Sequence, residues 1–291
     1  MTITGLLSLS LTLAACGGSN SNTPAVTPPV ATTPTTPTVP TTPTTPTTPT
    51  TPTTPTTPTT PTTPTTPTTP PVTAGTSTNA SCYNTALYTS GNTYQIDQQA
   101  KTGGSVTQAS TNKYTVNGVV PFKGNSATEL NIDTTVTAGS GAGTTNNNKS
   151  YGTLASDKFS YFGLVNTIST FGFSFVTTTT FTPPITTPLN LSAGGTYTYT
   201  TTQHTEVAGG GTTVPDVTQT VTVTYVGAES ITVPAGTFNT CKIKTDSTIN
   251  GTTTSGLSWT VNEGRYKGLF AKSDDGKGNV VEATKLLFNG S

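Results

Sequence analysis

Charged side chains are scarce in this sequence. Its 291 residues include 12 Lys and Arg and 12 Asp and Glu, so charged residues make up 8% of the chain, against roughly 25% in an ordinary soluble protein. The formal net charge is zero, and Arg265 is the single arginine. Because nucleic-acid binding depends on clustered Lys and Arg, we expect no nucleic-acid partner.

Histidine is rarer still, since His204 is the only one. This excludes a metal site built from several imidazoles, and a Ser-His-Asp arrangement would have to use this residue. In a strand, His204 and Glu206 would share a face, which fits either a reactive or ligating pair or a solvated polar surface. No glycine-rich loop lies between a strand and a helix as nucleotide binding requires. We expect no catalytic residue, no metal and no cofactor.

The amino terminus has no basic residue, and the first one in the chain is Lys101. Residues 6–15, LLSLSLTLAA, form an apolar run that is too short for the roughly 20 residues of a membrane-spanning helix but typical of a secretory signal. The sequence Leu13-Ala14-Ala15-Cys16 resembles the lipobox of bacterial lipoproteins. The resemblance implies that residues 1–15 are removed and that Cys16 carries palmitate-type acyl chains. The alternative is a buried apolar strand with an ordinary cysteine.

The same resemblance implies that residues 16–22 form a lipid-anchored segment. Because Gly17, not Asp, follows Cys16, it also implies the outer membrane as the location, with the chain facing the periplasm or the cell surface.

Residues 23–74 contain almost nothing except threonine and proline. Seventeen of the 23 prolines lie between Pro24 and Pro71, mostly as a Thr-Thr-Pro repeat. A proline at every third position matches the polyproline II helix, which rises about 3.1 Å per residue. We expect a disordered, extended linker. It is either a bare tether, a glycosylated stalk or a ligand for a peptide-binding groove.

Residues 75–291 lack the periodicity of amphipathic helices. Alternation is plain instead, as in Tyr197 and Tyr199 between threonines and in Val221, Val223 and Tyr225. Turn signals such as Asn-Gly pairs separate these runs. We expect an all-β domain, with a curved antiparallel sheet that forms a half-barrel or an open barrel.

A segment of this domain resembles uncharacterised bacterial envelope proteins. It comprises residues 226–238, VGAESITVPAGTF, followed by Cys241, and Trp259 and residues 268–272, GLFAK, fit the same pattern. In that group the strands form a half-barrel similar to lipoprotein-localisation factors. The resemblance covers about residues 194–290 and implies a fold that can hold a lipid or another apolar molecule.

Two cysteines remain if Cys16 carries lipid. In an oxidising compartment, Cys82 and Cys241 would either form a disulfide or stay as two buried thiols.

These observations lead to a non-enzymatic binding module tethered to the cell envelope. Its partners would be the membrane, through Cys16, and a lipid, an apolar small molecule or another envelope component, and we expect a monomer. The aromatic residues that could line a concave ligand face are Phe173, Phe175, Tyr197, Tyr199 and Trp259. Three alternatives stay open: these aromatics form the core, the chain is a structural or adhesive surface protein, or it is an envelope hydrolase. A ligand carrier needs a cavity of a few hundred cubic ångström.

Overall fold

The computed structural model describes residues 78–170, 173–209 and 214–290. Cys16, the signal segment 1–15, the anchor segment 16–22 and the linker 23–74 lie outside the described residues.

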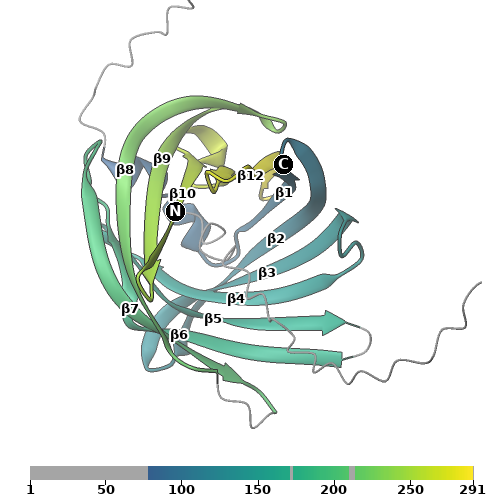
Figure 1. The fold of residues 1–291 in the computed structure, drawn as a ribbon, viewed down its shortest axis with the longest axis vertical. Coiled ribbons are helices and arrows are strands. Elements are labelled where there is room, and N and C mark those ends of the chain that lie inside the picture. Colours follow the sequence, from purple (N-terminus) through teal and green to yellow (C-terminus); the bar gives the residue numbers. More distant parts are fainter. Residues whose placement is uncertain (1–77, 171–172, 210–213, 291) are drawn as a thin grey trace, which may run out of the picture. The chain divides into compact units, whose positions relative to one another are not determined.

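The described chain is almost entirely antiparallel β-sheet, which confirms the all-β prediction (Figure 1). Twelve strands follow one another around a closed barrel, each paired with its neighbours in sequence. The strands are β1 (Thr93–Thr102), β2 (Ser105–Phe122), β3 (Asn125–Gly139), β4 (Thr145–Leu154), β5 (Lys158–Thr170), β6 (Phe173–Pro188), β7 (Thr196–Val207), β8 (Val217–Val233), β9 (Gly236–Ile249), β10 (Thr252–Val261), β11 (Phe270–Asp274) and β12 (Asn279–Phe288).

Closure comes from the pairing of the first strand with the last. β1 and β12 pair from Tyr94 opposite Phe288 to Thr102 opposite Asn279. The curved sheet therefore continues past the expected half-barrel or open barrel until its two edges meet. Closure removes the unpaired backbone groups that an edge strand would expose.

Threonine and valine alternate along β7 and β8 because the two sides of the sheet have different surroundings. Val221, Val223 and Tyr225 are buried on one face of β8. The threonines that alternate with apolar residues along β7 and β8 lie opposite one another on the other face. Their hydroxyls form three hydrogen bonds of 2.9 to 3.0 Å, between Thr198 and Thr222, Thr200 and Thr220, and Thr202 and Thr218.

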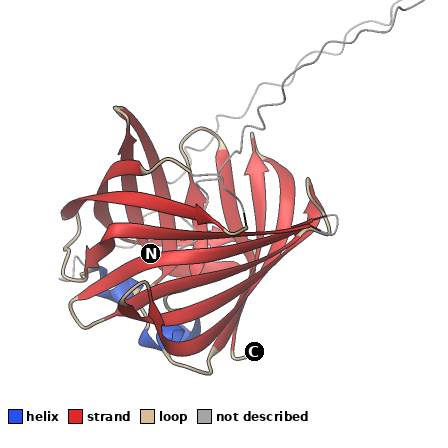
Figure 2. Cartoon of the chain, turned by 90° about the horizontal axis from the view of Figure 1, so that it is seen from below, coloured by secondary structure: helices blue, strands red, loops and turns tan. Residues whose placement is uncertain are grey.

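Two short 3-10 helices, η1 (Asn79–Cys82) and η2 (Thr85–Tyr88), lie together at one end of the barrel (Figure 2). Leu87 of η2 packs in a buried cluster with Ile96 and Leu130. Cys82 of η1 forms a disulfide with Cys241 of β9, with the two Cα atoms 5.6 Å apart. A third, η3 (Gly264–Tyr266), connects β10 to β11. No helix among the described residues has the length and apolar character needed to span a membrane.

Two long hairpins contain register shifts, and the tip of each contacts a strand outside the hairpin. The β2–β3 hairpin shifts register between Val116 and Gly118. At its tip, Nζ of Lys123 lies 2.9 Å from Oε2 of Glu206 in β7. The β8–β9 hairpin shifts register between Tyr225 and Gly227, and its tip bonds to β12 through the Ala235 amide and the Ala283 carbonyl.

Candidate functional site

The strand register assigns side chains to two faces of the barrel wall. Cross-strand partners lie on the same face, and residues two apart in a strand do so too. The face that carries Ile96 and Cys241 contacts Leu87 of η2 and Cys82 of η1. We call it the inner face.

At the end of the barrel that holds η1 and η2, the inner face is apolar and filled. Ile96 and Val221 have no exposed surface, and Tyr225 and Ile243 retain 1%. These residues pack against the two helices and against one another. The largest apolar part of the interior is therefore protein core.

Further along the strands, many amides and hydroxyls join apolar residues such as Val136, Val207 and Ile249 on the inner face. The register places on it Gln98, Ser110, Asn112, Thr134, Asn146, Asn148, Asn166, Thr177, Thr179, Gln203, Thr205, Gln219, Thr245, Ser247 and Ser258. Several of them, such as Asn148, Asn166 and Ser258, keep partial exposure although they face into a closed barrel. Solvent therefore reaches this end. Within the described strands, every Asp, Glu, Lys and Arg and His204 lies on the opposite face.

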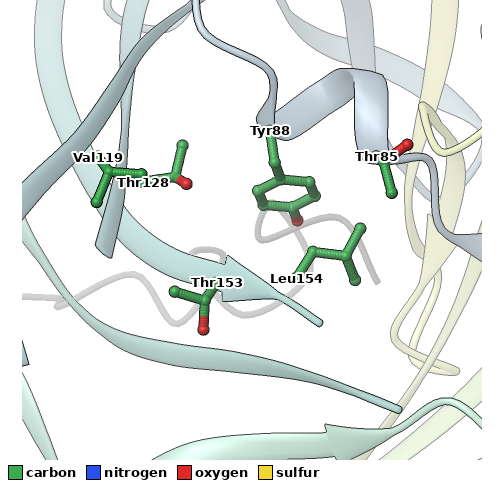
Figure 3. Close-up of a pocket in the computed structure, with 6 residues that line it drawn as sticks. All are labelled: Thr85, Tyr88, Val119, Thr128, Thr153 and Leu154. Carbon is green, nitrogen blue, oxygen red and sulfur yellow. The ribbon is translucent and has the colours of Figure 1, made fainter. Parts of the chain in front are cut away.

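A pocket of about 360 Å³ lies beside η2 (Figure 3). Tyr88 occupies its centre, and burial raises the pKa of the Tyr88 hydroxyl well above its ordinary value. The volume falls at the lower end of small-molecule sites, roughly 300 to 1,000 Å³. The residues that line it, from η2, β2, β3 and β4, are Thr85, Tyr88, Val119, Thr128, Thr153 and Leu154.

The aromatic residues expected to line one ligand face are separated. Tyr197 and Tyr199 lie near each other on the inner face of β7, with ring centroids 6.0 Å apart. Trp259 lies on the opposite face, because its neighbour Thr260 pairs with Cys241. Phe175 of β6 is 55% exposed. The Phe173 side chain lies outside the described part of the chain, and none of the other four residues lines the pocket.

Trp259 sits in a charged setting. The ammonium groups of Lys242 and Lys272 each lie 5.2 Å from the indole centroid. The indole Nε1–H donates a hydrogen bond to the carboxylate of Glu229. With 5% of its surface exposed, Trp259 stabilises the barrel wall through packing and cation–π attraction.

His204 also lies on the outer face. Its Nδ1 is 2.7 Å from an Asp216 oxygen, and its Nε2 is 3.7 Å from Glu206. Each of these three side chains is about half exposed. No group of three or more His, Cys, Asp or Glu side chains in the described residues could hold a metal ion.

Sequence reasoning missed Tyr88 and the inner amides. The run Asn146-Asn147-Asn148 was a usable signal, since asparagine is depleted in strands. The sequence around Tyr88 has no such signal, because the position of Tyr88 depends on contacts between η2 and distant strands.

No protein-family model matches this sequence, and no curated protein does. Among solved structures, a protein from Bacteroides fragilis, provisionally named as exported and with a YmcC-like fold, is 16% identical. It matches 68% of this chain and 96% of its own length, with a TM-score of 0.36. A protein from Parabacteroides distasonis, provisionally named a lipoprotein, is 14% identical. It matches 69% of this chain and 96% of its own, with a TM-score of 0.37. Likeness at this level carries no argument about what the chain does.

Proposed function

We propose that this chain is a lipoprotein of the cell envelope, anchored in the outer membrane through Cys16, whose barrel is a non-enzymatic binding module. The observation that carries the binding role is the difference between the two ends of the interior. One end is filled by core, and the other is lined by uncharged side chains, many of them polar, that solvent reaches.

The anchor is supported by the lipobox-like sequence that ends at Cys16. The disulfide between Cys82 and Cys241 is typical of a protein that folds outside the reducing cytosol. The Thr-Thr-Pro segment would then separate the barrel from the membrane.

The non-enzymatic character is supported by the inner face. General acid–base and nucleophilic catalysis rely mostly on ionisable side chains. In the described strands the Asp, Glu, Lys and His side chains lie on the outer face, where His204 and its acidic neighbours are solvated. Among the inward tyrosines, burial raises the pKa of Tyr199, so its hydroxyl stays protonated.

A second candidate is a structural or adhesive surface protein. It is favoured by the threonine pairs that β7 and β8 expose on the outer face. Such a module would bind through that surface and leave the interior empty of solutes.

Fractionation of cells that express the wild type and Cys16→Ala tests the anchor. We expect the wild type in the outer membrane and the variant in soluble form with an uncleaved signal. Membrane retention of the variant would contradict the lipobox.

Native mass spectrometry of the full chain in mild detergent tests the binding role. A stoichiometric added mass supports the binding module. A bare mass, together with no affinity for oligosaccharides or palmitate, favours the adhesive alternative.

A further inference from the structure

Three asparagines of β4 and β5 face the interior with unpaired side-chain oxygens. Their Oδ1 atoms, in Asn146, Asn148 and Asn166, are buried and have no hydrogen-bond partner. Some inner polar groups satisfy one another, as the hydroxyls of Thr179 and Thr205 do at 3.2 Å. Others, such as Gln98 and Ser150, also have a buried polar atom without a hydrogen-bond partner. Buried polar atoms in proteins are nearly always paired. Because Asn148 and Asn166 lie at the end of the barrel that solvent reaches, a partner for this cluster can come from outside the chain.

The unpaired amides are neighbours. Asn148 lies opposite Asn166, and Asn146 follows on the same face two residues away. Strands lie about 4.8 Å apart and residues on one face about 7 Å apart along a strand, so the three side chains converge on an area of roughly 5 by 7 Å.

An exposed aromatic ring lies in the same row. Asn146 pairs with Ile168, and Ile168 pairs with Phe175 of β6, so Phe175 is on the inner face about 10 Å from Asn146. Its ring is 55% exposed, whereas core residues of the same face retain at most a few per cent. Phe175 is therefore available for contact with a solute.

The charge of the inner face limits the chemistry of that solute. No Asp, Glu, Lys, Arg or His side chain of the described strands faces inward, so an anionic or cationic ligand would enter without a counter-charge, at a large desolvation cost. Amide groups donate and accept hydrogen bonds at once, as hydroxyl groups do. An apolar lipid would leave the amides unpaired.

We propose that Asn146, Asn148, Asn166 and Phe175 form a binding site for a neutral carbohydrate. The amides bond to the sugar hydroxyls, and the Phe175 ring packs against the apolar face of a pyranose. The inference rests on the proposed binding role and names its ligand class.

The test is isothermal titration of the full chain, solubilised in a polyoxyethylene detergent, which carries no sugar. The probes are neutral hexasaccharides of glucose, mannose and galactose, acidic hexagalacturonate, and palmitate. We expect at least one neutral hexasaccharide to bind and the acidic one not to. If no neutral hexasaccharide binds, the inference is wrong.

The variants locate the site. Asn148→Leu with Asn166→Leu, and separately Phe175→Ser, should weaken binding of the neutral sugar by about tenfold each. Asn147→Leu is the matched control, because Asn147 lies between two of the amides in sequence but bonds to Asn131 and Asp133 on the outer face. It should bind as the wild type does.

The same variants separate a ligand site from a structural network. Replacing unpaired amides by leucine should leave the melting temperature unchanged or raise it, whereas Asn147→Leu should lower it. Unchanged sugar affinity in the double variant and in Phe175→Ser would overturn the site. Binding of palmitate without any neutral sugar would keep the proposed binding role and refute the carbohydrate. If the wild type does not fractionate with the membrane, the lipid anchor is refuted and the carbohydrate site is not.

Discussion

Asn79 and Leu191 hold each other through two hydrogen bonds. The backbone N–H of Asn79 donates to the Leu191 carbonyl at 2.9 Å, and the backbone N–H of Leu191 donates to Oδ1 of Asn79 at 2.9 Å. The Asn79 carboxamide also donates to the Pro188 carbonyl at 2.7 Å. Only 1% of Asn79 is exposed, so this side chain ties η1 to the connection between β6 and β7 in a dry setting.

Asn79→Ala should therefore destabilise the barrel. The substitution leaves the Leu191 N–H and the Pro188 carbonyl without partners, at a cost of about 2 to 4 kcal/mol in the free energy of unfolding. Urea unfolding measures it. The control is Asn239→Ala, since Asn239 is exposed and its side chain donates a hydrogen bond to Glu263. Equal stability losses in both variants would show that the buried hydrogen bonds of Asn79 stabilise the fold no more than the exposed one of Asn239.

The disulfide between Cys82 and Cys241 should contribute strongly to stability. It closes a loop with a sequence separation of 159 residues. Such a loop corresponds to an upper figure of about 5 kcal/mol in the chain-entropy account. Reductant should lower the urea midpoint of the wild type and leave that of a Cys82→Ala, Cys241→Ala variant unmoved. Two free thiols in the mass of the oxidised wild type would contradict the bond.

Gly163→Ala should disturb β5 where its register with β6 shifts. A Cβ atom at this position would overlap the Thr179 carbonyl oxygen and lie 2.9 Å from the Phe122 ring. Phe122 is itself stacked on Tyr151, with centroids 3.9 Å apart, so the ring has little room to move. We expect a loss of about 3 kcal/mol or more in the free energy of unfolding. Gly194→Ala, where no atom lies within 4 Å, isolates the effect of backbone conformation.

Glu129 should make stability depend on acid. Burial raises the pKa of this carboxyl, but hydrogen bonds from Asn117, Tyr151 and Lys149 outweigh it and hold the pKa below its ordinary value of 4.5. A carboxyl with a lowered pKa in the folded state stabilises the fold above that ordinary value, and the contribution is lost as pH falls through the folded pKa.

The measurement is the melting temperature of the wild type and Glu129→Gln between pH 6 and about pH 3. The difference between the two proteins should shrink as pH falls below about 4.5. A difference that is constant with pH would show that the carboxylate charge of Glu129 contributes nothing.

Local patterns predicted the strands well. Alternation of Val221, Val223 and Tyr225 with threonines needs only that one side of a sheet be buried, and this is a property of neighbouring residues. The same reasoning did not predict that the aromatic residues expected to line one ligand face lie apart. Whether Trp259 shares a face with Tyr199 depends on three strand pairings and on the register of each.

The sequence by itself determined the all-β class and the antiparallel pairing, because side-chain periodicity and turn residues act over a few positions. Only the tertiary structure decided that β1 meets β12, that η1 and η2 fill one end, and that Asn148, Asn166 and Phe175 share the other. These outcomes depend on contacts between segments that are far apart in the chain. In a closed barrel, register decides which neutral side chains gather inside, and no local pattern encodes the register of distant strands.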